Sequence, residues 1–190
     1  MNNIDYTLNR IYEQHDAVCN QTYGGELPYS FHLKAVVAQA LRYKKLLRIQ
    51  GINKTGGLEA MIYWTDEMIA NVTIAAAGHD LIEDARLTYN DVVKLTGSDA
   101  AEIIYNCTEE KGRNREGRHS DKFFDEISLN RHAVFVKLCD IMANVLFSQL
   151  TNSSMYHKYR QEFPHLKEKL YIAEEYDPIW IDLENLLNIG

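Results

Sequence analysis

The chain has 190 residues, of which 46% are hydrophobic and 25% charged, as in a soluble globular protein with a sizeable core. Its formal net charge of -7 argues against binding to nucleic-acid polymers and to anionic membranes, because both require basic surfaces. No apolar run approaches the ~20 residues that span a bilayer, the polar start does not resemble a secretory signal, and three scattered cysteines suggest no disulfide framework, so we expect a cytoplasmic protein.

Helical periodicity dominates the chain, and the 10 glycines and 3 prolines are too few for a turn-rich all-β fold. We predict an amphipathic helix over about 4–19, a Gly/Pro loop over 20–30 and a helix that begins near His32. After the break "QGINKTGG", a long helix is predicted from about 58 to 84, apolar nearly all round in its second half. Gly78 within it indicates close packing or close approach of a ligand.

The second half of the chain is also predicted to be helical. Thr88 and Asp91 resemble a capping box for a short helix that stops at Gly97, and Ser98 starts another helix. The stretch 109–122 lacks apolar periodicity and is predicted to be a loop, and an apolar helix follows from about 130 to 150. A C-terminal helical extension, 151–190, is expected to be broken or kinked at Pro164. We predict one all-α domain over residues 1–190.

Ionisable residues follow the apolar part of the long predicted helix. Residues three or four apart share a helix face, so His79 is predicted to stand over Glu83, and Asp80 over Asp84. Taken singly, His79 and Asp80 are also compatible with hydrogen-bonded polar residues at a helix end. Glu83 and Asp84 are likewise compatible with an acidic turn beyond the core. The same type of residue nevertheless recurs in two other inward helices, as His32 and Asp140.

Two imidazoles and two carboxylates from three central helices form a typical ligand set for a divalent cation. Mn²⁺, Fe²⁺, Co²⁺, Zn²⁺ and Mg²⁺ are all compatible with nitrogen and oxygen donors of this kind. The two carboxylates would offset the charge of the cation and so make its burial affordable. The ordered set therefore favours a metal site over isolated polar residues.

The order His32, His79-Asp80, Asp140 resembles the H…HD…D signature of the HD-domain metal-dependent phosphohydrolases. The finer resemblance is to the hydrolase domain of RelA/SpoT-type alarmone enzymes and their small stand-alone relatives, and it covers roughly residues 5 to 150. It rests on "GELPYSFH", "HDLIEDARLTYNDVVKLTG" and "KLCDIMANV", which match the family's "GEPY-x-x-H", "HD-x-x-ED-T" and "KLAD-x-x-x-N". The resemblance implies an HD-domain helical bundle.

The resemblance also implies roles for individual residues. His32, His79, Asp80 and Asp140 would hold one divalent ion, usually manganese in this family. Glu83 and Asp84 would position and deprotonate the attacking water, and Asn144 would lie against the nucleotide. The family reaction removes pyrophosphate from the 3′ position of guanosine tetra- or pentaphosphate.

The sequence departs from the family on the substrate side. The basic "RKSGEPY" before the first histidine is replaced by "QTYGGELPY", in which Tyr23 is a candidate for stacking on a base and Leu27 is an extra residue. Asn144 is also compatible with a surface or capping residue. Lys137 is either a structural partner of a carboxylate or a phosphate ligand.

The predicted loop 109–122 is basic in places. Its Lys111, Arg113 and Arg115 are candidates for neutralising substrate phosphates, but acidic residues are interleaved with them, as in an ordinary solvated loop.

Three functions fit these observations. The first is a Mn²⁺-dependent (p)ppGpp 3′-pyrophosphohydrolase-like enzyme; the second is an HD phosphohydrolase for another nucleotide or a phosphorylated cofactor; the third is a non-catalytic nucleotide sensor. We expect a small-molecule nucleotide as the substrate, and a homo-oligomer is compatible with the sequence.

Overall fold

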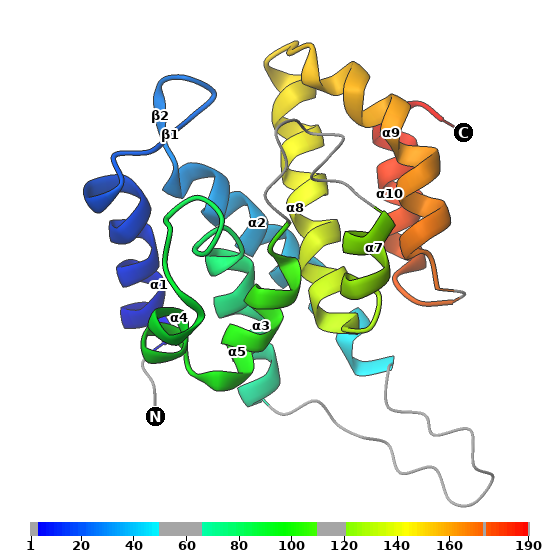
Figure 1. Ribbon diagram of the computed structural model, residues 1–190. Coiled ribbons are helices and arrows are strands. Elements are labelled where there is room, and N and C mark those ends of the chain that lie inside the picture. Colours follow the sequence, from blue (N-terminus) through cyan, green and yellow to red (C-terminus); the bar gives the residue numbers. More distant parts are fainter. Residues whose placement is uncertain (1–3, 50–65, 110–120, 173, 190) are drawn as a thin grey trace, which may run out of the picture.

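The protein is described from a computed structural model, in which residues 4–49, 66–109, 121–172 and 174–189 are placed (Figure 1). This part of the chain is helical apart from a two-stranded hairpin, so the predicted all-α class is confirmed. The elements are α1 Ile4–Glu13, a π-helical turn Gln14–Val18, β1 Thr22–Tyr23, β2 Leu27–Pro28, α2 Ser30–Tyr43, a 3-10 helix Lys44–Ile49, α3 Asp66–Gly78, α4 Tyr89–Thr96, α5 Ser98–Cys107, α7 Asp121–Ile127, α8 Arg131–Leu150, α9 Met155–Leu170 and α10 Asp177–Leu187.

Helix α8 is the centre of the bundle. It packs against α2, α3 and α5 on one side and against α7, α9 and α10 on the other (Figure 1). Its length and apolar composition would allow it to cross a membrane, but 67% of its most apolar window is buried inside the protein. Such burial is typical of a core helix, because the apolar side chains are already covered by neighbouring helices.

The hairpin lies within the predicted loop 20–30. Tyr23 pairs with Leu27 and Thr22 with Pro28 in an antiparallel register, so the extra residue Leu27 becomes the strand partner of Tyr23. Gly24 and Gly25 make the turn with φ angles of 62° and 94°, values that glycine adopts without strain.

The long predicted helix ends earlier than expected. Helix α3 stops at Gly78, and residues 79–85 continue in turns; the predicted start near 58 lies outside the described residues. A β-carbon on Gly78 would lie 2.9 Å from Ile104 Cδ1, so this glycine serves close packing. Among the backbone hydrogen bonds of residues 79–85, the bond from Asp84 N to Asp80 O, at 2.8 Å, has the i→i−4 spacing of an α-helix. Asp80 and Asp84 therefore remain neighbours although the helix has ended.

Other predicted boundaries are confirmed. Thr88 and Asp91 form the reciprocal hydrogen bonds of a capping box, α4 ends before Gly97, and α5 begins at Ser98.

Two predicted boundaries differ from the structure. Helix α7 begins at Asp121 and thus takes the last two residues of the predicted loop, whereas most of that loop lies outside the described residues. Helix α9 runs through Pro164, so the C-terminal section is not broken there.

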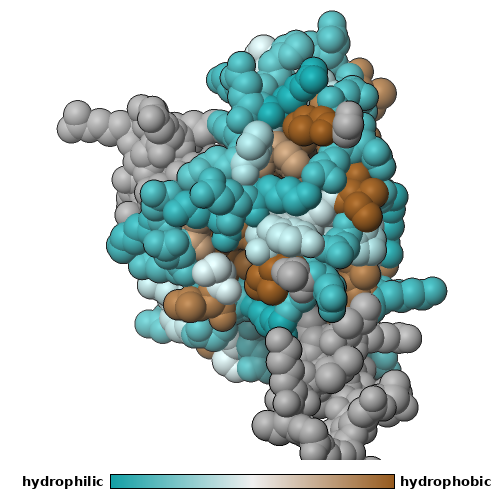
Figure 2. Space-filling view, turned by 90° about the vertical axis from the view of Figure 1, so that its right-hand side faces the viewer, coloured by the Kyte–Doolittle hydropathy of each residue, from teal (hydrophilic) through white to brown (hydrophobic). Residues whose placement is uncertain are grey.

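The surface that carries α9 and α10 is mostly hydrophilic, with apolar side chains in separate small patches (Figure 2). Most apolar side chains of α10 face the core: Trp180 and Leu183 are almost completely buried, whereas Ile181 is 55% exposed. The C-terminal helices therefore extend the core around α8. That residues 1–190 form one domain stays a prediction.

Candidate metal centre

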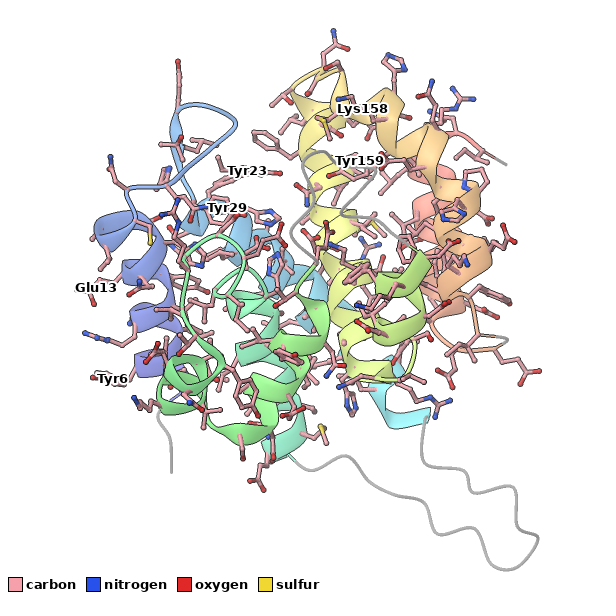
Figure 3. The ribbon with its side chains drawn as sticks, viewed as in Figure 1. Tyr6, Glu13, Tyr23, Tyr29, Lys158 and Tyr159 are labelled. Atoms are coloured by element: carbon pink, nitrogen blue, oxygen red, sulfur yellow. The ribbon has the colours of Figure 1, made fainter. Side chains whose placement is uncertain are left out.

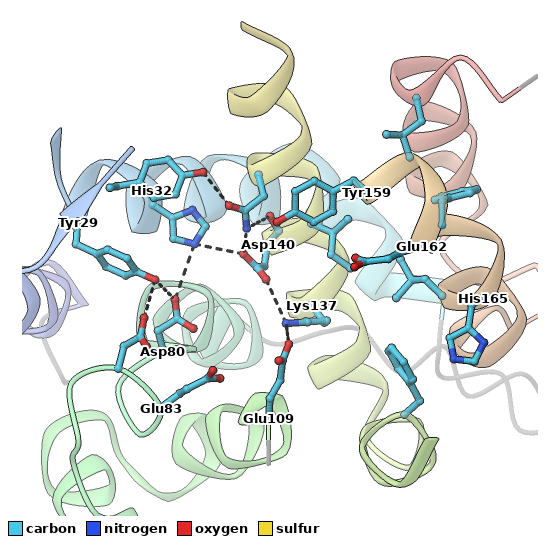
Figure 4. Close-up of a pocket in the computed structure, with 18 residues that line it drawn as sticks. Tyr29, His32, Asp80, Glu83, Glu109, Lys137, Asp140, Tyr159, Glu162 and His165 are labelled. Atoms are coloured by element: carbon cyan, nitrogen blue, oxygen red, sulfur yellow. Dashed lines mark hydrogen bonds and ion pairs between the residues drawn. The ribbon is translucent and has the colours of Figure 1, made fainter. Parts of the chain in front are cut away.

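Three helices deliver the predicted ligands to one place. His32 comes from the first turn of α2, His79 from the turn after α3, and Asp140 from the middle of α8. One donor atom of each lies within 4.8 Å of the others, and all three residues are buried. Asp80 adjoins them, with Oδ2 at 3.1 Å from His79 Nε2. The same oxygen lies 3.9 Å from His32 Nε2 (Figure 4).

The two imidazoles are oriented so that Nε2 faces the carboxylates. His79 Nδ1 lies 3.0 Å from the carbonyl oxygen of Ala76, which fixes the proton on Nδ1. The lone pair of Nε2 is thereby left to bind a metal ion. His32 Nε2 lies 3.2 Å from Asp140 Oδ1, and its ring is stacked on that of Tyr23 with centroids 4.8 Å apart. The buried Nε2 of His79 makes no well-aligned hydrogen bond. An orphan imidazole nitrogen beside two carboxylates fits a divalent cation.

The carboxylates of this cluster are held in the charged form. Burial by itself would raise the pKa of Asp140, but Lys137, His32 and His79 hold it well below its usual range. Burial opposes charge on Asp80 as well, yet the neighbouring His79 keeps its pKa low. The buried His79 has a raised pKa because Asp80 and Asp140 attract a positive charge. The same attraction acts on a metal ion.

Asp140 is fixed by neighbours on its own helix. Asn144 Nδ2 donates to Asp140 Oδ1 at 2.6 Å, and Asn144 Oδ1 accepts from the Tyr23 hydroxyl at 2.8 Å. Lys137 Nζ lies 2.7 Å from Glu109 Oε1 and 3.4 Å from Asp140 Oδ2. These bonds hold the ligand carboxylate in one orientation.

The predicted water-activating pair lies beside the cluster. Asp84 Oδ2 accepts from Gln21 Nε2 at 3.0 Å and from the Tyr29 hydroxyl at 3.1 Å. Glu83 is half-buried, and its pKa is raised by burial and then by the negative charge of Glu109. A carboxylate with a raised pKa accepts a proton more readily, which suits a general base.

A cavity of about 490 Å³ connects these groups to the C-terminal helices (Figure 4). Tyr23 and Tyr29 reach it from the hairpin side, and Tyr159 reaches it from α9 (Figure 3). Its lining residues are Tyr23, Tyr29, His32, Asp80, Glu83, Asp84, Glu109, Phe124, Lys137, Asp140, Ile141, Asn144, Tyr159, Glu162, Phe163, His165, Leu166 and Leu187. The volume is within the range of small-molecule sites.

Of the predicted substrate contacts, Tyr23, Asn144 and Lys137 line the cavity, where each is also bonded to another residue of the site. Lys111, Arg113 and Arg115 lie outside the described residues. All six roles stay predictions.

Four further residues contact or line the site although the sequence predicted no role for them: Gln21, Tyr29, Glu109 and Tyr159. Only Tyr29 had a signal, as the tyrosine of the "GELPYSFH" motif.

The fold and donor set define a helical bundle with a buried His/Asp cluster that could hold a divalent metal. Among solved structures, this chain is similar to a metazoan ortholog of SpoT that hydrolyzes ppGpp and plays a role in starvation responses. The TM-score is 0.71 at 18% sequence identity, over 100% of this chain and 96% of that chain. No protein-family model and no curated protein matches the sequence. The chain thus has the fold that the RelA/SpoT resemblance predicted.

Proposed function

We propose that the chain is a divalent-metal-dependent phosphohydrolase that acts on a nucleotide, most closely like a (p)ppGpp 3′-pyrophosphohydrolase. The observation that carries this proposal is the convergence of His32, His79, Asp80 and Asp140 beside the Glu83-Asp84 pair. The shared fold with a ppGpp hydrolase supports it. We propose Mn²⁺ as the ion, as the family resemblance implies, and the cytoplasm as the location.

The residues of the chain divide the chemistry between them. His32, His79, Asp80 and Asp140 would hold the cation, which when bound lowers the pKa of a water and polarises a phosphoryl oxygen. Glu83 would take the proton of the attacking water, since its raised pKa makes it the better proton acceptor. Asp84, held on one oxygen, would orient that water through the other.

The test is hydrolysis by the purified chain with Mn²⁺ and a panel of 3′- and 5′-phosphorylated nucleotides, with released phosphate and pyrophosphate separated by chromatography. The double variant Glu83→Gln/Asp84→Asn should lose at least about 100-fold in kcat and still bind Mn²⁺, because it lacks the base and keeps the ligands. A matched control is Asp125→Asn/Glu126→Gln, an exposed acidic pair on α7. Metal binding without turnover of any substrate would contradict the proposal, and so would equal effects of the two double variants.

A second candidate is hydrolysis of another nucleotide or a phosphorylated cofactor at the same site. Tyr23 and its hairpin stand where the family has basic residues, and Tyr23 is already stacked on His32. Among the described lining residues, six are carboxylic acids and Lys137 is the single lysine or arginine. Such a lining favours substrates with fewer phosphate charges than guanosine tetraphosphate. A clear preference for guanosine tetraphosphate in the panel would exclude this candidate.

A further inference from the structure

Asp84 is anchored by two residues that lie far from it in the sequence. Gln21 Nε2 donates to Asp84 Oδ2 at 3.0 Å, and the Tyr29 hydroxyl, which shares its single proton with the nearer Asp80 Oδ2, lies 3.1 Å from the same Asp84 oxygen. Within the described part of the chain, the other oxygen, Oδ1, makes no hydrogen bond. An exposed aspartate would otherwise rotate among several side-chain conformers.

The side chain of Gln21 is oriented by a hydrogen bond to His15. Its Oε1 lies 2.7 Å from Nδ1 of His15, a side chain with no exposed surface. Burial lowers the pKa of His15, which favours the neutral ring. Gln21 Oε1 can only accept a hydrogen bond, so the His15 proton lies on Nδ1 and is donated to that oxygen. The amide oxygen is thereby turned toward His15 and the amide nitrogen toward Asp84.

Tyr29 lies between two carboxylates. Its hydroxyl is 2.5 Å from Asp80 Oδ2 as well as 3.1 Å from Asp84 Oδ2 (Figure 4). Its ring is stacked on that of His15, with the ring centroids 5.1 Å apart. The single hydroxyl proton of Tyr29 therefore lies between the two carboxylate oxygens. The hydroxyl therefore separates the ligand Asp80 from Asp84, which would otherwise repel each other directly.

We propose that Tyr29, Gln21 and His15 form a positioning unit that holds Asp84 Oδ2 and leaves Oδ1 available to the attacking water. The catalytic part of this inference rests on the proposed function. The unit acts through Asp84 and does not touch the substrate.

The first test is Tyr29→Phe, which keeps the ring on His15 and removes only the hydroxyl. We expect kcat to fall about 10–100-fold, as for other residues that orient the groups of a metal site, while KM changes less than about threefold. Gln21→Leu should also lower kcat, and Gln21 contacts no predicted metal ligand directly. The control is Tyr43→Phe, whose hydroxyl bonds to Asp182 away from the cavity and whose loss should leave kcat unchanged.

A double variant separates action through Asp84 from action through Asp80. Adding Tyr29→Phe to Asp84→Asn should cause little further loss, because the carboxylate to be positioned has already been removed. A further loss of about 10-fold or more, with a matching drop in Mn²⁺ affinity, would show that the hydroxyl serves Asp80 and would overturn the inference.

A crystallographic readout remains decisive if the wild-type chain hydrolyses nothing. The side chain of Asp84 should keep its conformation in crystals of the wild type and of Tyr43→Phe, and should move in Tyr29→Phe. An unmoved Asp84 in Tyr29→Phe would overturn the inference whatever the enzyme assay shows. Lack of turnover together with a moved Asp84 would contradict the proposed function and support the positioning unit.

Discussion

Glu83 and Asp84 are adjacent in the sequence but lie in different surroundings. Glu83 is half-buried near Glu109, which favours its protonated form, whereas Asp84 is exposed and held by Gln21 and Tyr29. Two carboxylates with different surroundings are suited to different tasks. The difference supports Glu83 as the proton acceptor and Asp84 as the group that orients the water.

The raised pKa of Glu83 leads to a prediction for the pH dependence of activity. A raised pKa means that Glu83 gains its proton, and stops acting as a base, at a higher pH than an ordinary glutamate with a pKa near 4.5. The acid limb of log kcat against pH should therefore lie above pH 4.5.

The Glu83→Gln variant tests whether Glu83 is the group that titrates in this acid limb. The Glu83→Gln variant should lack this acid limb in its residual activity, because the titrating group is gone. An unchanged acid limb in that variant would assign the limb to another group.

The hairpin is the element in which this chain departs most from the family pattern. Tyr23 bonds to Asn144 and stacks on His32, and a β-carbon at Gly24 would lie 2.7 Å from the ring of Phe147. The hairpin is therefore packed tightly against α8. It forms one wall of the site through these contacts.

Two neighbouring glycines allow a matched test of this packing. Gly24→Ala and Gly25→Ala both place a side chain at positive φ, but only Gly24→Ala adds a clash, since nothing lies within 4 Å of a β-carbon at Gly25. We expect Gly24→Ala to cost about 1–3 kcal/mol more in unfolding free energy, measured by denaturant titration. Equal losses in the two variants would show that the hairpin is not tightly packed on α8.

The sequence predicted the helical elements better than their ends. Thr88 and Ser98 were located because capping is a local interaction. The early end of α3 at Gly78 was not predicted, because Leu81, Ile82 and Ala85 continue the helical period of apolar residues past it. The same limit applies to the site. The motif residues were found from helical spacing and from the resemblance to the family motifs, whereas Gln21 reaches Asp84 only through the tertiary fold.

On the scale of the whole molecule, the C-terminal helices complete the cavity. Tyr159 and Glu162 of α9 and Leu187 of α10 line it opposite the hairpin. Trp180 of α10 is 1% exposed and contacts the ring of Phe163 on α9. The helices that follow the motif-matched region are therefore part of both the core and the cavity wall.

Trp180→Ala tests this structural role. The truncation should cost about 3–5 kcal/mol of unfolding free energy, because it opens a large cavity in the core. Ile181→Ala, on the same helix but 55% exposed, should change stability by less than about 0.5 kcal/mol. Thermal unfolding of both variants measures the difference. Similar melting temperatures for the two would contradict the docking of α10.

The most direct test of the central claim is a crystal structure of the chain soaked with Mn²⁺, with the ion located by its anomalous scattering. The account predicts one peak about 2.0–2.6 Å from donor atoms of His32, His79, Asp80 and Asp140. The same peak should persist in Glu83→Gln and vanish in Asp140→Asn. A peak elsewhere, or an ion that Asp140→Asn leaves in place, would contradict the account.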